Sequence, residues 1–151
     1  MSVYIIIEPE TTEDIAAYYQ LRYEVLRKPW NQPEFTTKDQ TEDKSIHVMM
    51  KDENGKTVAA GRLLLLNSSE GQLRSMAVHE NYRGQGLGSK ILRYIETKAK
   101  ENNLSSIILD ARAPAVHFYE KHGYAVYADS YVLFGVIPHF KMRKNLFGGS
   151  I

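Results

Sequence analysis

The sequence predicts a single mixed α/β domain whose sheet is mostly antiparallel and carries helices on its faces. Short apolar runs bounded by turn residues alternate with amphipathic segments, in the order β, α, β, β, β, α, β, α, β, β. Three successive strands joined by short turns are expected to be antiparallel neighbours. Residues 72–111, by contrast, form a strand, helix, strand unit, which pairs its two strands in parallel through a right-handed crossover.

The length of the chain favours one domain. Its 151 residues fall within the usual size of a single domain and can bury a sizeable core. We expect residues 1–147 to form this domain. Residues 148–151 are rich in glycine and serine, and we expect them to form a flexible tail.

The first part of the chain predicts a strand, a helix and a long loop. Residues 3–7 form a β-branched run that ends before a proline. Thr11 and the acids after it have N-cap chemistry, and a helix continues toward Pro29. Residues 27–45 are polar and contain two prolines, so we expect an irregular segment that lines a substrate entrance. Trp30 in this segment either shapes a pocket or anchors the segment to the core.

The middle of the chain predicts three antiparallel strands. Residues 46–50 and 57–66 are apolar runs separated by an Asp-Glu-Asn-Gly turn, which is typical of a hairpin. A second polar turn at residues 67–71 leads into another run at residues 72–78. These three runs should therefore lie side by side in the sheet.

The period of the apolar residues changes after residue 78. Helical spacing predicts an amphipathic helix that buries Leu87, Ile91, Leu92, Ile95 and Ala99. Residues 107–111 form a short apolar strand, and residues 116–122 a helix that ends at Gly123. Residues 124–127 and 138–143 are expected to be the two closing strands.

Composition excludes several classes of function. The 19 basic and 18 acidic residues leave a net charge of +1, so no overall field attracts nucleic acid or an anionic membrane. The absence of cysteine excludes thiol catalysis and thiolate metal sites, and we expect no metal. The apolar runs are far shorter than the roughly 20 residues of a membrane helix, and no secretion signal is recognisable at the N-terminus. We therefore expect a cytoplasmic protein without nucleic-acid or membrane partners.

A glycine-rich strand-to-helix junction is the most informative feature of the sequence. Gly84, Gly86 and Gly88 permit backbone conformations and close approaches that a Cβ atom would block. The free amides and the dipole at the start of the next helix attract an anion, and Arg83 and Lys90 add positive charge. The junction therefore predicts a phosphate site, the alternative being a turn that only caps the helix.

Two common phosphate motifs do not fit this junction. A Walker loop needs Gly-Lys-Ser/Thr, whereas residues 88–90 read Gly-Ser-Lys. The dinucleotide fingerprint counted from Gly84 requires a third glycine where Ser89 stands. The spacing that does fit is Arg-x-x-Gly-x-Gly, from Arg83 to Gly88, directly after a strand.

Two sequence blocks resemble the GNAT superfamily of acetyl-CoA-dependent N-acyltransferases. Residues 76–88 read MAVHENYRGQGLG and residues 118–124 read FYEKHGY, in the order and spacing of that family. Further similarity at His47 and at residues 137–139 suggests the small bacterial ElaA-like branch. The resemblance implies a mostly antiparallel sheet with a central splayed parallel strand pair, helices on both faces, and acetyl transfer to an amine.

The resemblance also implies a site for acetyl-CoA. Backbone amides of the glycine-rich junction would bind the pyrophosphate, and the strand before it would pair with the pantetheine amides. A bulge near Met76 would aim an amide at the thioester carbonyl. The cofactor-binding residues so implied are Met76, Ala77, Val78, Arg83, Gly84, Gln85, Gly86, Leu87, Gly88 and Ser89.

Tyr119 matches the tyrosine that serves as general acid in this family. A phenol stays protonated at neutral pH and can deliver its proton to the departing thiolate of CoA. The alternative is that Tyr119 only packs beside Phe118 in an aromatic helix face.

The general base is less well defined by the sequence. Many relatives have a glutamate where this chain has Gln72, which cannot titrate. His47, His79 and His139 are the candidates that remain, with Glu24 behind them. Of the histidines, His47 and His139 are preferred because they match the ElaA-like pattern.

These observations predict an N-acetyltransferase that moves an acetyl group from acetyl-CoA to a primary amine by direct attack. A noncatalytic acyl-CoA-binding or sensing module is the main alternative, because no base is obvious, and a nucleotide-binding regulator is a third. The identity of the amine, the acyl chain preferred and the oligomeric state, monomer or homodimer, are not determined by the sequence.

Overall fold

The computed structural model describes residues 3–147, and the expected tail at residues 148–151 lies outside this range. The sheet has seven strands: β1 (Ile5–Ile7), β2 (Ser45–Lys51), β3 (Thr57–Leu65), β4 (Glu70–Val78), β5 (Ser106–Arg112), β6 (Ala125–Leu133) and β7 (Ile137–Asn145). The α-helices are α1 (Thr12–Leu26), α2 (Leu87–Glu101) and α3 (Val116–Lys121). Among these helices, none is long and apolar enough to cross a membrane.

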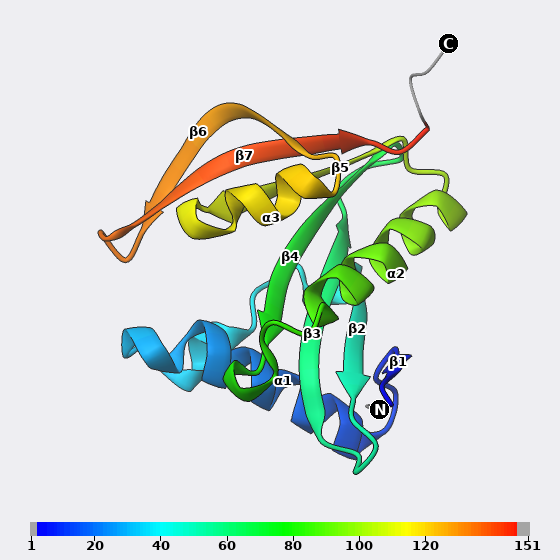
Figure 1. Cartoon of the computed structure of the whole chain (residues 1–151), viewed down its shortest axis with the longest axis vertical. Coiled ribbons are helices and arrows are strands. Elements are labelled where there is room, and N and C mark those ends of the chain that lie inside the picture. The colour runs from blue at the N-terminus through cyan, green and yellow to red at the C-terminus, as the bar shows by residue number, and fades with distance from the viewer. Residues whose placement is uncertain (1–2, 148–151) are drawn as a thin grey trace.

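The strands lie in the order β1-β2-β3-β4-β5-β7-β6, and helices cover both faces, as predicted (Figure 1). On one face, α2 and α3 enclose the main core, and the five α2 residues predicted from helical spacing are all buried there. On the other face, Tyr18 and Leu21 of α1 pack against Met49 and Ala60. Successive side chains of a strand point to opposite faces, so Met49 of β2 packs against α1 while Val48 and Met50 belong to the main core.

The central feature of the sheet is its only parallel strand pair in the described residues, β4 with β5. Their register covers three residue pairs, from Glu70↔Ser106 to Gln72↔Ile108, and then ends. Beyond this point β4 continues beside β3 while β5 continues beside β7, so the two strands diverge as Figure 1 shows. The splayed pair implied by the family resemblance is therefore present.

A β-bulge interrupts the ladder between β3 and β4. Ala60 pairs with Ala77 and Arg62 with Arg74, so Gly61 faces two residues of β4, Ser75 and Met76. Ser75 has a φ of +56°, the left-handed region that a non-glycine residue rarely adopts. The structure thus has a bulge beside Met76, as the family resemblance implied.

Two segments differ from the sequence prediction. Residues 27–45 were expected to be irregular, but three short 3₁₀ helices occupy Lys28–Trp30, Glu34–Thr37 and Glu42–Lys44. The closing strands β6 and β7 extend well beyond residues 124–127 and 138–143. Most of β6 is exposed, so it lacks the alternation of apolar and polar residues by which a half-buried strand is recognised.

Two buried arginines attach the segment at residues 34–44 to the helix and the sheet. Arg22 of α1, 2% exposed, donates to both carboxylate oxygens of Glu42, at 2.7 and 2.9 Å. Arg62 of β3, 1% exposed, donates to Asp39 at 3.1 Å and lies 3.5 Å from Glu42. Because buried charges need partners, this network fixes the segment against the core.

We predict that Glu42→Gln destabilises the fold strongly. The substitution removes the negative charge that two buried guanidiniums share, and breaking a buried ion pair in this way costs about 3 kcal/mol. Urea unfolding should show a lower midpoint with an unchanged slope. Glu34→Gln, which alters an exposed glutamate of the same segment, is the control, and equal midpoints for the two variants would contradict the prediction.

Candidate active site

A cleft of about 1090 Å³ lies where β4 and β5 diverge. Its walls come from β4 and β5, the start of α2, α3, the end of α1 and the hairpin of β6 and β7. The cleft therefore exists because the parallel ladder stops at Gln72. It includes nine of the ten residues implied for cofactor binding, all except Gln85, whose side-chain oxygen instead accepts a hydrogen bond from Tyr4.

The start of α2 presents unpaired amides to this cleft. Gly86 is the N-cap and supplies no side-chain cap, and the first helical hydrogen bond is donated by Lys90 to the Gly86 carbonyl. The amides of residues 87–89 therefore precede the helical ladder, and all three residues line the cleft. Such a helix start has the hydrogen-bond donors and the partial positive charge that bind phosphate.

Backbone conformation explains two of the glycines. Gly84 and Gly86 have φ of +82° and +78°, and no other atom would lie within 4 Å of a Cβ at either position. Glycine is needed there because L-residues rarely adopt this conformation. At Gly88 the backbone is ordinary, but a Cβ would lie 3.4 Å from the ring of Phe118.

Within the described residues 3–147, the edge of β4 that faces β5 has no strand partner beyond Gln72. On its other edge β4 pairs with β3 as far as Val78, apart from the bulge at Ser75 and Met76. An unpaired strand edge offers a row of amides and carbonyls to any extended ligand with amide groups of its own. Residues 72–78 of β4 all line the cleft. Figure 1 shows that this strand leads to the start of α2.

Tyr119 of α3 lines the cleft and is 7% exposed. Its ring packs edge-on against Phe118 and Tyr124, at centroid distances of 5.0 and 5.8 Å. Burial raises the pKa of its hydroxyl, with a smaller opposing effect of the Arg112 charge. The phenol therefore remains protonated at neutral pH, and among residues 3–147 its hydroxyl forms no hydrogen bond.

His139 of β7 lies in the same cleft and is 6% exposed. Its Nδ1 atom is 2.9 Å from the carbonyl oxygen of Ile137, and its ring stacks on Tyr131 at 4.5 Å. A carbonyl oxygen only accepts, so Nδ1 is the donor in this bond, and in the neutral ring the lone pair lies on Nε2. His139 is thus held by packing and by one hydrogen bond in a tautomer that can accept a proton.

The other two candidate histidines do not line the cleft. His47 uses Nδ1 to accept from the Tyr18 hydroxyl at 2.6 Å and Nε2 to donate to the Glu42 carbonyl at 2.8 Å. Burial lowers the pKa of His47. His79 accepts from the amide of Asn81 at 3.1 Å and caps a short 3₁₀ helix. Both histidines are engaged in local structure.

The cleft also contains charged residues that the sequence analysis did not select. Asp110 of β5 accepts from Ser130 at 2.5 Å and from the amide of Gln72 at 3.3 Å, across the splay. The available signal was a lone carboxylate in the otherwise apolar run at residues 107–111. The other unselected charged residues of the lining are Arg22, Arg27, Asp39, Arg62, Arg74 and Arg112.

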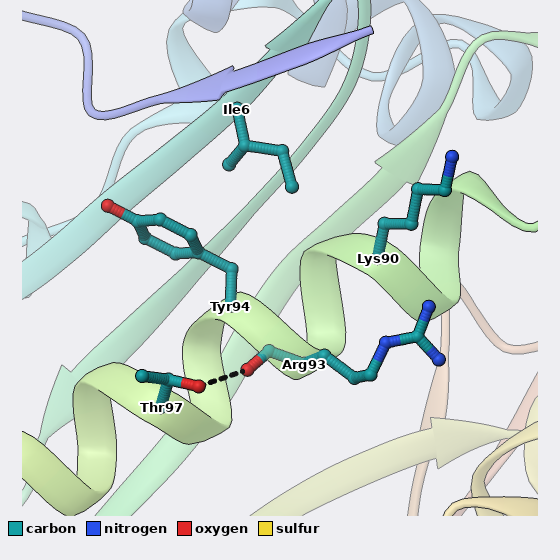
Figure 2. Close-up of a pocket in the computed structure, with 5 residues that line it drawn as sticks. All are labelled: Ile6, Lys90, Arg93, Tyr94 and Thr97. Carbon is teal, nitrogen blue, oxygen red and sulfur yellow. Dashed lines mark hydrogen bonds between the residues drawn. The ribbon is translucent and has the colours of Figure 1, made fainter.

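A second, more open pocket of about 350 Å³ lies between β1 and the outer face of α2 (Figure 2). It contains the hydroxyl of Thr97, which donates to the Arg93 carbonyl at 3.0 Å, and no carboxylate or histidine. Its lining residues are Ile6, Lys90, Arg93, Tyr94 and Thr97. None of the predicted catalytic or cofactor-binding residues lines this pocket, whereas most of them line the cleft between β4 and β5. The cleft is therefore the candidate active site.

The chain is similar to known acetyltransferases. It matches the model of the Acetyltransferase (GNAT) family over residues 15–124. It is 34% identical over 133 residues to the uncharacterized N-acetyltransferase YjcF of Bacillus subtilis (strain 168), which covers 88% of this chain and 94% of that protein.

Solved structures share the fold. Escherichia coli ElaA superposes with a TM-score of 0.81 at 22% identity, over 96% of this chain and 100% of that one. A GNAT family acetyltransferase from Elizabethkingia anophelis with acetyl-CoA bound superposes with a TM-score of 0.76 at 16% identity, over 94% and 97%. The family match, the splayed strands and the glycine-rich helix start agree, and the chain belongs to the acetyltransferase (GNAT) family.

Proposed function

We propose that this protein transfers an acetyl group from acetyl-CoA to a primary amine by direct attack. The observation that carries the proposal is the continuous path along one cleft, from the free amides of α2, along the open edge of β4, to Tyr119 and His139. The acetyl-CoA bound to the Elizabethkingia anophelis protein of the same fold supports this choice of donor.

The cofactor end of the path is formed by backbone atoms. The amides of residues 87–89 would bind the pyrophosphate, with the helix dipole adding to the attraction. The open edge of β4 would pair with the amides of the pantetheine arm. A backbone amide at the bulge of Ser75 and Met76 would stabilise the negative charge that forms on the carbonyl oxygen of the thioester when the amine attacks.

Two side chains would move the protons of the reaction. Acetyl-CoA supplies an activated acetyl group whose C–S bond breaks as the C–N bond forms. Nε2 of His139 would take a proton from the attacking amine, and Tyr119 would donate its phenolic proton to the departing sulfur. The proton on His139 then leaves to solvent and Tyr119 is reprotonated, so no covalent enzyme intermediate is needed.

We predict that Gly86→Glu weakens acetyl-CoA binding by at least about tenfold, or about 1.4 kcal/mol, because it places a side chain and a negative charge at the phosphate site. Gly55→Glu is a matched control, since Gly55 has a φ of +83° and equally open surroundings in the turn between β2 and β3. Both variants should lose about 1–2 kcal/mol of stability through backbone strain. Calorimetric titration with acetyl-CoA checks the prediction, and equal affinities for the two variants would exclude this site.

We predict that Tyr119→Phe lowers kcat by about 10²-fold or more and leaves the affinity for acetyl-CoA within about twofold, because it removes only the proton donor. Tyr124→Phe is the control. Tyr124 is a buried neighbour whose hydroxyl donates to Glu96 at 2.9 Å, so its loss should cost about 1 kcal/mol of stability and no activity. Amine-dependent release of CoA measures kcat, and an unchanged kcat in Tyr119→Phe would remove Tyr119 from the mechanism.

We predict that His139→Gln lowers kcat by about 10²-fold, because the amide has no basic nitrogen to take the proton of the amine. His47→Gln and His79→Gln, which alter histidines outside the cleft, should retain the kcat of the parent protein. The same CoA-release assay compares the three variants. Loss of activity in His47→Gln alone, at unchanged stability, would assign the base to His47 instead.

A further inference from the structure

The end of the cleft away from α2 is rich in arginine. We call it the acceptor end and define it by Arg27, Trp30, Arg74 and Tyr131. It is closed by a contact between Trp30 and Phe134 of the β6–β7 turn, whose ring centroids are 6.2 Å apart. The proposed base, His139, stacks on Tyr131, so the acceptor end adjoins the reacting centre.

The arginines of this region outnumber the carboxylates that neutralise them. Glu42 is bound bidentately by Arg22, and Asp39 lies 3.1 Å from Arg62 and 3.3 Å from Arg74. The region holds four arginines, Arg22, Arg27, Arg62 and Arg74, with these two carboxylates. Asp110 also lies in the cleft, but Gln72 and Ser130 satisfy its oxygens. The region therefore retains an excess of positive charge.

Of these four arginines, Arg27 alone forms no ion pair with a carboxylate among residues 3–147. No carboxylate among residues 3–147 lies within ion-pair distance of its guanidinium, and its side chain forms no hydrogen bond there. Its guanidinium lies over the ring of Phe134, with Cζ 5.8 Å from the ring centroid. Burial and the positive charge of Arg22 lower the pKa of Arg27. A partly buried guanidinium with five unused donors favours the binding of an anion.

Arg74 faces the same space and is only partly neutralised. It shares Asp39 with the fully buried Arg62, and 39% of its side chain is exposed. Although burial and the Asp110 carboxylate raise the pKa of Tyr131, the charges of Arg74 and Arg27 both lower it. Arg27, Arg74 and Tyr131 all line the same cleft, so the charges of both guanidiniums lie on the wall to which this hydroxyl belongs.

We propose that Arg27 and Arg74 bind an anionic group of the acceptor, so that the preferred substrates are primary amines that also carry a carboxylate or a phosphate. This inference rests on the proposed acetyltransferase function and specifies its substrate class. The anion would complete the partnership that Arg27 lacks, while the amine end of the same molecule would reach Nε2 of His139 across Tyr131. Amines that carry a second positive charge would be repelled.

The test compares probes that differ only in charge. One series is the linear amino acids from glycine to 6-aminohexanoate, and the other is the n-alkylamines of matching length. O-phosphoethanolamine tests a phosphate, and 1,4-diaminobutane tests a second cation. We expect the best amino acid or O-phosphoethanolamine to exceed its uncharged counterpart by about tenfold or more in kcat/KM, and whichever of the two is preferred identifies the anion.

The variants Arg27→Gln and Arg74→Gln should each bring the kcat/KM ratio of anionic amines to n-alkylamines down to within about twofold of one. Arg93→Gln is the matched control, because it removes an exposed arginine of the second pocket, on the outer face of α2 (Figure 2). Calorimetric titration of each probe into the CoA-saturated protein gives the same comparison without turnover.

The outcomes separate this inference from the proposed function. If n-alkylamines and anionic amines are acetylated with equal kcat/KM, the proposed substrate class is wrong and the proposed transferase activity stands. If no probe is acetylated but the anionic probes bind in an Arg27-dependent manner, the anion site stands and acetyl transfer to these amines fails. Equal binding of charged and uncharged probes overturns the anion site.

Discussion

The early end of the β4–β5 ladder is the constraint on which the rest of the site depends. Three pairs join the strands, and their divergence creates the cleft, frees the edge of β4 and directs β5 to β7. The same divergence brings the start of α2 and the side chains of α3 and β7 to one space. Each part of the site is ordinary secondary structure. The divergence of two neighbouring strands is what brings these parts together around one cleft.

The two ends of the cleft offer different chemical groups to a ligand. At the start of α2 the donors are backbone amides, so the sequence requirement falls on the glycines that shape the loop. At the acceptor end the proposed donors are the side chains of Arg74, which pairs with Asp39, and Arg27, which pairs with no carboxylate among residues 3–147. The overall charge of +1 gives no sign of this local excess. Charge distribution, and not net charge, therefore determines what the cleft attracts.

Much of the fold, and the helix start that is proposed to bind the cofactor, could be predicted from sequence because local patterns determine them. Helical spacing identified the buried face of α2, and the glycines between residues 84 and 88 identified the helix start. The acceptor end could not be predicted in this way, because Arg27, Arg74 and Tyr131 are distant in sequence and line one cleft only in the folded chain. For the same reason sequence alone did not separate His139 from His47, whose ring nitrogens are occupied by Tyr18 and Glu42.

The shortness of the β4–β5 ladder has a mechanical consequence. It divides the sheet into two halves, β1–β4 and β5–β7, whose backbone connection in the middle of the sheet is slight. A ligand that pairs with the open edge of β4 and also contacts β5 or α3 joins these two halves. Its binding free energy therefore adds to the stability of the sheet, and a ligand that fills the cleft also stiffens the molecule.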